Sequence, residues 1–315
     1  MSGWSERLKR ESGVPDLVEV LTERLAPSDL QSLLLEVYAR LASKVRPAQL
    51  LQQHEENRFV APSPADPRLL AEVDRAAWEL LPEGYLPLEL SPLCPLGTNA
   101  AIATVSQNKV VSTTRNTEAV ADSTNMLALE SAARRRRQPR SKEGQPPVLL
   151  AASQRVTRAQ VFKGKRSWAH FRLLSLCAAG RDTGAFRFES SQLVEQIAFQ
   201  ARLLRELARW GRVYSSIRIA VTDFTSGRLR ERLEASVLAP LSERIPDAHV
   251  HLDPGRTSGR GYYDAACFKL FALDASGEEI ELGDGGTVDW TAKLLSDRKE
   301  RLVISGLGVE RICAR

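Results

Sequence analysis

The end of the chain carries side chains that could bind a phosphate. The stretch LVISGLGVERICAR, residues 302–315, combines a short apolar run with Gly306, Gly308 and Arg311. Glycines let a ligand approach the backbone closely, and a guanidinium group can grip a phosphate with two parallel hydrogen bonds. A Gly-x-Gly pattern is common, so it does not assign a function by itself.

A second stretch, STTRNTEAVADSTN, could bind an amine. Arg115, Thr117 and Glu118 lie at the end of a predicted strand, and a polar helix start follows them. A carboxylate held beside an arginine can hold a ligand's amine by charge-assisted hydrogen bonds, each worth about 1.5–3 kcal/mol. Taken alone, the two charged residues are better explained as a surface ion pair.

A third stretch, QRVTRAQVFKGKRSWAHF at 154–171, is basic and contains no acidic residue. Like charges repel one another when packed together, so this strand-loop-strand unit must face either water or an anion. Both interpretations stay open. The basic residues are Arg155, Arg158, Lys163, Lys165 and Arg166. We expect Trp168, His170 and Phe171 at its end to belong to the core.

A fourth stretch, LGDGGTVDW at 282–290, places Gly285 and Gly286 between Asp284 and Asp289. Two adjacent glycines allow either a tight hairpin turn or a close approach of a ligand to the backbone. The hairpin turn is the simpler interpretation.

The elements around these stretches predict an α+β protein. Apolar residues at helical spacing predict helices over 16–58, with Ser28 and Asp29 as a helix start, and further helices are predicted at 68–81, 187–210 and 227–240. A proline-rich linker covers 60–67, and 134–147 is an exposed basic loop. Short β-branched runs predict strands at 101–105, 109–114, 216–221, 249–252, 267–273 and 301–306. This order favours a mixed or antiparallel sheet flanked by helices.

Composition limits the classes of protein that need to be considered. The net charge is +5, from 44 Lys and Arg against 39 Asp and Glu, which suits a nucleotide ligand but is too common to prove one. No run approaches the roughly 18 apolar residues of a membrane span, and the N-terminus lacks a signal-peptide core, so we expect a cytoplasmic protein. Four cysteines without metal-ligand spacing are expected to be buried thiols, and no zinc site is predicted.

The order of the four stretches resembles the catalytic core of class II aminoacyl-tRNA synthetases, and the histidyl-tRNA synthetase branch in particular. ELSPLCPLG, with Pro92, is similar to the family's dimerisation motif, and TRNTEAVADST and QRVTRAQ follow in the family's order. GRGYYDAACFKLF with Tyr262 and Tyr263, then GGTVDW and ISGLGVER, complete the series. The resemblance covers about residues 68–315. It implies a six- or seven-stranded, mostly antiparallel sheet and a homodimer.

The resemblance implies a catalytic domain over 61–315. The helical spacing of apolar residues predicts a helical extension over 1–60, which matches no family that we can name. Arg155 and Arg311 would act in catalysis by holding the α- and γ-phosphates of ATP, with Mg²⁺ implied through ATP alone. The expected ATP-binding residues are Arg155, Arg158, Gly306, Gly308 and Arg311. The expected amino-acid-binding residues are Arg115, Thr117, Glu118, Tyr262, Tyr263, Gly285 and Gly286.

The chain also departs from the family pattern. Thr157 stands where the family has an acidic residue that contacts adenine, and Thr287 stands where it has an arginine. The arginine expected before the tyrosine pair has no counterpart in register, and only Arg256 or Arg260 could replace it. Leu173 and Cys177 replace the groups that bind an imidazole, and an unsatisfied polar group costs about 1–3 kcal/mol, so free histidine is not the expected substrate.

Three functional hypotheses follow. The favoured one is an ATP-dependent amino-acid-activating ligase that forms an acyl-adenylate from an amino acid or related carboxylate, for transfer to an acceptor other than a whole tRNA read by its anticodon. The retained Arg115, Glu118, Arg155 and Arg311 motivate it. The alternative is a catalytically silent paralogue acting as a ligand-binding regulatory subunit of a partner protein. In the third, the basic run at 134–140 would dock RNA, with a steep salt dependence, although a solvated loop is the preferred interpretation.

Overall fold

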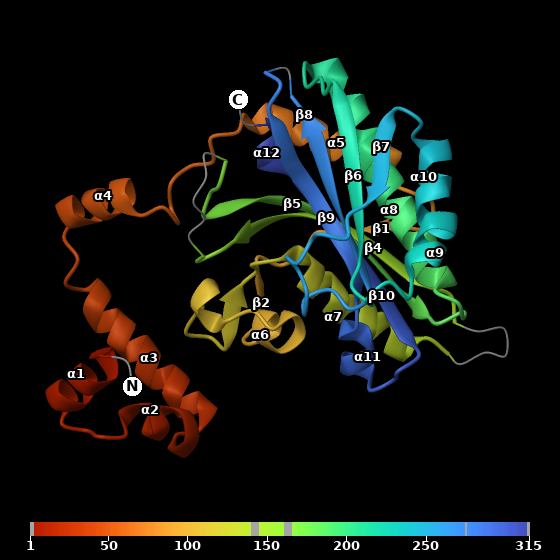
Figure 1. Cartoon of the computed structure of the whole chain (residues 1–315). Coiled ribbons are helices and arrows are strands. Elements are labelled where there is room, and N and C mark those ends of the chain that lie inside the picture. The colour runs from red at the N-terminus through yellow and green to blue at the C-terminus, as the bar shows by residue number, and fades with distance from the viewer. Residues whose placement is uncertain (1–2, 140–144, 161–165, 275, 314–315) are drawn as a thin grey trace. The chain divides into compact units, whose positions relative to one another are not determined.

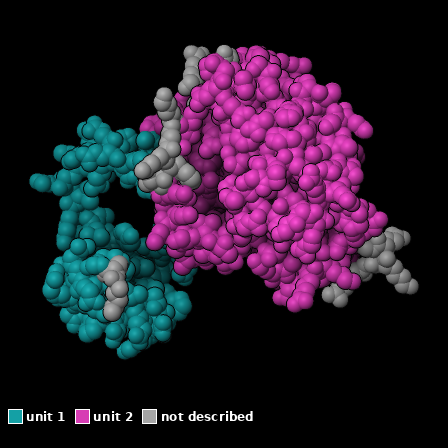
Figure 2. All heavy atoms as spheres, in the orientation of Figure 1, with its two compact units in different colours: residues 1–61, 112–117 teal, residues 62–111, 118–315 magenta. Residues whose placement is uncertain are grey.

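The computed structural model describes residues 3–139, 145–160, 166–274 and 276–313, and the chain divides into two compact units (Figures 1 and 2). The first unit contains residues 1–61 and 112–117, and the second contains 62–111 and 118–315.

The first unit is helical. Its helices are α1 (Gly3–Ser12), α2 (Leu17–Glu19), which continues as a π-helical turn over Val20–Arg24, α3 (Pro27–Ala42) and α4 (Pro47–Glu56). The helices expected over 16–58 are therefore confirmed. Helix α3 begins at Pro27, just before the predicted start at Ser28, because the fixed φ of proline suits the first helical position. None of these helices contains a buried residue in the described chain.

The second unit is built on one large sheet with the strand order β1-β4-β5-β10-β9-β8-β6-β7. Its strands are β1 (Leu86–Pro87), β4 (Val148–Thr157), β5 (His170–Arg181), β6 (Ser216–Asp223), β7 (Ala248–Leu252), β8 (Ala266–Leu273), β9 (Glu279–Val288) and β10 (Glu300–Gly308). The two outermost pairs are parallel, and all pairs between them are antiparallel. The predicted α+β class is confirmed, although within the described residues the sheet has eight strands rather than six or seven.

Helices cover both faces of the sheet. Residues of α5 (Pro67–Leu80), α8 (Arg187–Glu206) and α10 (Ala239–Arg244) form one core, and α7 (Ser123–Arg137) and α11 (Trp290–Leu295) pack in the other (Figure 1). Strand β5 illustrates the cause, because successive side chains of a strand point to opposite faces. Leu176 and Ala178 lie in the first core, whereas Cys177 and Ala179 lie in the second.

Two predicted strands were wrong. The AIATV run lies largely in α6 (Thr98–Ala103), and the run at 109–114 follows a 3₁₀ turn over Gln107–Lys109 instead of forming a strand. The short strands β2 (Leu93–Pro95) and β3 (Thr117–Ala119) lie on either side of this region. The backbone N–H groups of Gly97 and Asn99 donate to the Glu118 carboxylate. An anion at the start of a helix stabilises that helix, so the segment is helical although its residue types favour a strand.

The predicted basic loop at 134–147 was also wrong in its first part. Arg134–Arg137 complete α7, and the Arg135 side chain is 2% exposed and ion-paired with Glu300. Residues 140–144 lie outside the described residues. The expected turn at Gly285–Gly286 is instead the interior of β9, between β8 and β10.

The remaining elements are the turn of helix α9 (Arg230–Leu233), which continues as a π-helical turn over Glu234–Leu238, a 3₁₀ turn over Leu207–Trp210, and α12 (Val309–Cys313). All four cysteines are buried free thiols. In the parts of the chain that the structure describes, no helix combines the length and apolar character needed to cross a bilayer.

Candidate ligand-binding site

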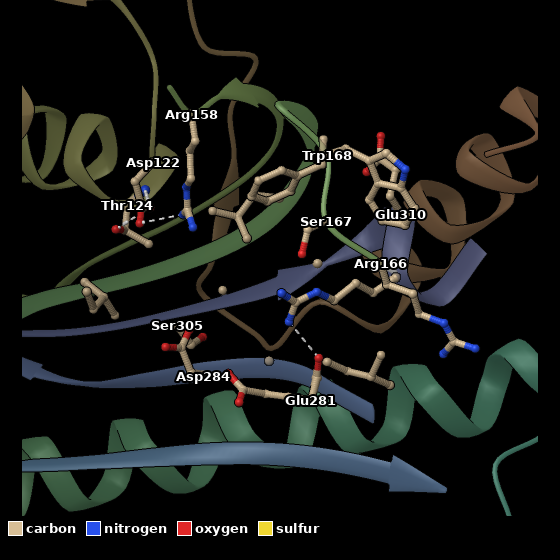
Figure 3. A pocket seen from close by; sticks show the side chains of 18 of the residues that line it. Asp122, Thr124, Arg158, Arg166, Ser167, Trp168, Glu281, Asp284, Ser305 and Glu310 are labelled. Atoms are coloured by element: carbon tan, nitrogen blue, oxygen red, sulfur yellow. Dashed lines mark hydrogen bonds and ion pairs between the residues drawn. The ribbon is translucent and has the colours of Figure 1, made fainter. Parts of the chain in front are cut away.

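Two adjoining cavities lie in the second unit. The first, which we call the β10 cavity, has a volume of about 240 Å³ and is lined by residues of β5, β9, β10 and the start of α7 (Figure 3). The second, which we call the α7 cavity, has a volume of about 410 Å³ and is lined by Asn99, Asn125 and Arg256 among others. The cavities share the lining residues Asp122, Arg158, Tyr262, Tyr263, Glu281 and Asp284.

The fold brings part of the expected site together. Six of the predicted ligand-binding residues line the β10 cavity, although they come from distant parts of the sequence. They are Arg158, Tyr262, Tyr263, Gly306, Gly308 and Arg311. Trp168 and Phe171, which we expected in the core, also line it. Lys163 and Lys165 lie outside the described residues.

Acidic groups outnumber basic groups in the β10 cavity. Its lining contains the arginines Arg158, Arg166 and Arg311, and the carboxylates Asp122, Glu281, Asp284 and Glu310. Each arginine already has a partner. Arg158 pairs with Asp122 at 3.3 Å (Figure 3). Arg166 pairs with Asp274 at 3.2 Å, and Arg311 Nη1 donates to the Glu281 backbone carbonyl at 2.9 Å.

Arg155, which we expected to hold a phosphate, does not line either cavity. Its Nη1 lies 2.9 Å from Glu310 Oε1 and 3.0 Å from His170 Nδ1. Glu310 is 1% exposed and also accepts hydrogen bonds from the Ser63 hydroxyl and the Arg172 backbone N–H. The ion pair therefore links β4 to α12 through a buried carboxylate.

Glu118 is fully buried and lines neither cavity. Its carboxylate accepts hydrogen bonds from the backbone N–H groups of Gly97 and Asn99 and from the side chains of Asn99 and Gln107, at 2.7–3.0 Å. Burial alone would raise the pKa of Glu118, but these donors outweigh burial and hold it below its usual value. The geometry does not place this carboxylate against a ligand's amine.

Arg115 and Thr117 also line neither cavity, and both belong to the segment 112–117 that groups with the first unit. Gly285 and Gly286 are packed within the sheet. A Cβ atom would lie 2.4 Å from the Ile304 carbonyl oxygen at Gly285, and 2.5 Å from the Ala266 carbonyl oxygen at Gly286. Glycine is required there by neighbouring strands, which explains the pair without a ligand.

Asp122 and Asp284 form the acidic side of both cavities, and sequence reasoning assigned a role to neither. Asp122 caps α7 by accepting from the Thr124 backbone N–H, and the Tyr262 hydroxyl lies 3.4 Å from its other oxygen. The Tyr263 hydroxyl donates to Asp284 at 3.1 Å. Burial, followed by the nearby charges of Glu281 and Asp122, raises the pKa of Asp284. The aspartate before a Ser-Thr helix start was the available sequence signal for Asp122.

Asn125 and Arg256 line the α7 cavity. The sequence singled out Arg256 only as an out-of-register replacement, and Asn125 was missed because a polar residue in the first helical turn has many uses. Within the described ranges, no group of three or more His, Cys, Asp or Glu side chains could hold a metal ion.

Comparisons with known proteins show which solved structures have a similar fold. No protein-family model matches the chain, and no curated protein matches it in sequence. An ATP phosphoribosyltransferase regulatory subunit/histidyl-tRNA synthetase from Bacillus halodurans C matches in structure with a TM-score of 0.58 and 15% identity, over 81% of this chain and 82% of that one.

Two further solved structures match with a TM-score of 0.56. One is the apo histidyl-tRNA synthetase of S. aureus, at 14% identity over 80% of this chain and 68% of that one. The other is the RNA binding domain of threonyl-tRNA synthetase from Cryptosporidium parvum Iowa II, at 12% identity over 80% of this chain and 64% of that one. At these identities the likeness concerns the fold, and this chain therefore has a class II aminoacyl-tRNA synthetase-like fold.

Proposed function

We propose that this chain binds an amino acid or a related small carboxylate in the α7 cavity and acts as a regulatory subunit, without activating the ligand with ATP. The observation that carries the proposal is the position of Arg155. In the ligase hypothesis this arginine neutralises the α-phosphate, yet its Nη1 atom contacts Glu310 and His170, and the residue lines neither cavity.

The charge of the β10 cavity supports the same proposal. ATP carries several negative charges, and a site that holds it must supply a surplus of positive charge or of hydrogen-bond donors. Here four carboxylates face three arginines that already have partners. Binding ATP would require these contacts to be exchanged.

The α7 cavity is better suited to a zwitterion. Basic side chains slightly outnumber acidic ones in its lining. Arg158 and Lys269 are paired with Asp122 and Glu281, and the lining also contains Lys109, Arg256 and Asp284. A ligand that carries both a carboxylate and an amine can satisfy groups of both signs in such a site.

The regulatory role is suggested by a structural neighbour, whose description names a regulatory subunit of ATP phosphoribosyltransferase. The proposed ligand would shift an equilibrium of a partner protein by binding one of its states more tightly. We also propose a homodimer, which the resemblance of the segment around Pro92 to a dimerisation motif suggests. Sedimentation of the purified chain would test that pairing.

A second candidate function is the amino-acid-activating ligase with ATP and Mg²⁺. It is favoured by one observation, the convergence of Arg158, Gly306, Gly308 and Arg311 on the β10 cavity. This hypothesis requires Arg155 to exchange Glu310 for a phosphate when the nucleotide binds.

Calorimetry and ATP–pyrophosphate exchange on the same preparation separate the two candidates. Each amino acid is tested in both assays, with Arg311→Ala as the control variant. We expect binding of one amino acid without exchange, and binding that survives Arg311→Ala. Exchange that depends on one amino acid and disappears in Arg311→Ala would replace the regulatory proposal with the ligase. No binding and no exchange with any amino acid would reject an amino acid as the ligand in both candidate functions.

A further inference from the structure

Most of the exposed large apolar side chains belong to the first unit (Figure 2). Among the described residues, sixteen such side chains are exposed, and eleven of them belong to residues 3–61. No described residue before Ala65 belongs to one of the hydrophobic cores. Helices as short as α1–α4 are only marginally stable in water without packing. The helices of the first unit therefore need a further apolar surface to pack against.

The largest group of these side chains lies on α3 and in the turn that follows it. Each member is between 40% and 58% exposed, and the members are Leu33, Val37, Tyr38, Leu41 and Val45. Leu33, Val37 and Leu41 recur at intervals of four residues, which places them on one side of the helix. We call these five side chains the α3 face.

The charges of α3 differ in sign between its two ends. In the middle of the helix, Arg40 and Glu36 pair with each other at 2.7 Å. Asp29 lies in the first turn, and Lys44 lies just beyond the last residue of the helix. Neither of these two has an ion-pair partner among the described residues. A partner helix that matches α3 therefore carries its charges in the reverse order.

A second copy of α3, packed antiparallel, has that order. Asp29 of one copy then lies at the same end as Lys44 of the other, and the opposite ends of the two helix dipoles also meet. Parallel packing would instead bring each of these charges beside its own equivalent, and like charges repel one another. The charge pattern of α3 is thus complementary to itself in one direction only.

We propose that two copies of this chain associate through their α3 faces, packed antiparallel about a two-fold axis near Val37. Leu33 of one copy then lies against Leu41 of the other, and both apolar faces leave water. This interface is separate from the pairing suggested for the segment around Pro92, because Pro92 belongs to the second unit. It is also independent of the proposed ligand-binding function.

Cysteine cross-linking of the full chain tests both the contact and its direction. The four native cysteines are buried, so introduced surface cysteines report the cross-link. Leu33→Cys/Leu41→Cys should form a covalent dimer under mild oxidation, whereas neither single variant should. The two introduced cysteines of one chain are about 12 Å apart along the helix, which is too far for an internal disulfide. Val213→Cys, at an exposed position of the second unit, gives the level of collisional cross-linking.

The direction of packing decides which variants cross-link. Efficient dimers from either single variant would indicate parallel packing and would overturn the antiparallel interface. A double variant that gives no more dimer than Val213→Cys would show that the two faces do not meet, which also overturns the proposal.

Sedimentation equilibrium of the full chain measures the strength of association. Leu41→Lys should weaken it by roughly tenfold or more, because a charge would be buried against the apolar face of the other copy. Val213→Lys is the matched control and should leave association unchanged. At low salt, Asp29→Lys should weaken association by roughly threefold, and Asp29→Lys/Lys44→Asp should restore it. Parallel packing would show no such restoration.

The outcomes separate this inference from the other proposals. Equal association constants for wild type and Leu41→Lys would overturn it, whether or not the segment around Pro92 pairs. A monomeric wild type whose Leu41→Lys variant sediments more slowly would show that the α3 face covers the second unit of its own chain, and would overturn it as well. Calorimetry of amino-acid binding should give the same result for both proteins, so failure of the ligand-binding function would leave this inference standing.

Discussion

Arg155 Nη1 and Glu310 Oε1 are 2.9 Å apart, and this ion pair joins the end of β4 to the short helix α12. Glu310 is the residue immediately before Arg311, the arginine on which the nucleotide hypothesis depends. The ion pair therefore connects two of the segments that the family resemblance assigns to ATP, without a ligand between them. Arg155 has a structural use in the absence of a phosphate.

Arg155→Ala is expected to destabilise the fold. Glu310 would be left buried without its cation, and an uncompensated buried charge with its remaining donors costs about 1–3 kcal/mol in the free energy of unfolding. Urea denaturation measures the change, and Arg260→Ala, at an exposed position, should stay within about 0.5 kcal/mol of the wild type. An Arg155→Ala variant of wild-type stability would contradict the structural role.

Arg135→Met should cost about 3–5 kcal/mol of unfolding free energy, because it removes one partner of a buried pair. Arg135 donates to both oxygens of Glu300, at 2.9 and 2.8 Å, and both residues are almost fully buried. Arg136 is the matched control, since it is the next residue along α7 and is exposed. If Arg135→Met and Arg136→Met had equal midpoints in urea, the buried pair would have no role in stability.

Gly285→Ala should destabilise the sheet by about 1–3 kcal/mol, the usual cost of overpacking. The added methyl group would lie 2.4 Å from the Ile304 carbonyl oxygen and 2.6 Å from the Phe268 ring, so the strands would have to move apart. At Gly308 the nearest atom to an added methyl group is 3.7 Å away, which is ordinary contact. Thermal unfolding should therefore separate Gly285→Ala from Gly308→Ala, and similar melting temperatures would refute the packing explanation.

Asp284→Asn should stabilise the protein at neutral pH. Burial, with Glu281 and Asp122 next, raises the folded-state pKa of Asp284 above its ordinary value of 3.8. The contribution of this carboxyl group to stability is therefore fully present below pH 3.8 and is lost as the pH rises through the raised value. The advantage of Asp284→Asn over wild type should appear above that value and shrink as the pH falls toward 3.8.

Urea unfolding of wild type and Asp284→Asn between pH 4 and pH 7 measures the difference between their free energies of unfolding. If the advantage of Asp284→Asn in unfolding free energy grew as the pH fell, the folded-state pKa of Asp284 would be depressed, which would contradict the prediction.

Patterns within one element were predictable from the sequence. The alternating and continuous apolar runs of β6, β8 and β10 and the long amphipathic run of α8 indicate their own structure, because each contributes to the core through its own spacing. The run at 101–105 was misread because a residue outside the run decides its conformation. The carboxylate of Glu118 stabilises the start of α6, and no local pattern contains that contact.

The candidate site also contains residues that the sequence predicts and residues that it does not. Arg158, Tyr262, Tyr263, Gly306, Gly308 and Arg311 could be named from ordered motifs, and they do converge on one cavity. Arg155 and Glu118 belong to the same motifs by residue type, yet buried partners hold them outside both cavities. The burial of Asn125 and Arg256 beside the α7 cavity could not be inferred, because burial is defined by what surrounds a residue.

The sequence by itself determined the class of fold and six of the residues that line the β10 cavity, since motif order and hydrophobic spacing are properties of the chain. The tertiary structure alone decided which charged groups are free to meet a ligand. The physical reason is that a charge is neutralised by its neighbours in space, and pairs such as Arg155 with Glu310 and Arg135 with Glu300 join residues more than 150 positions apart in the chain.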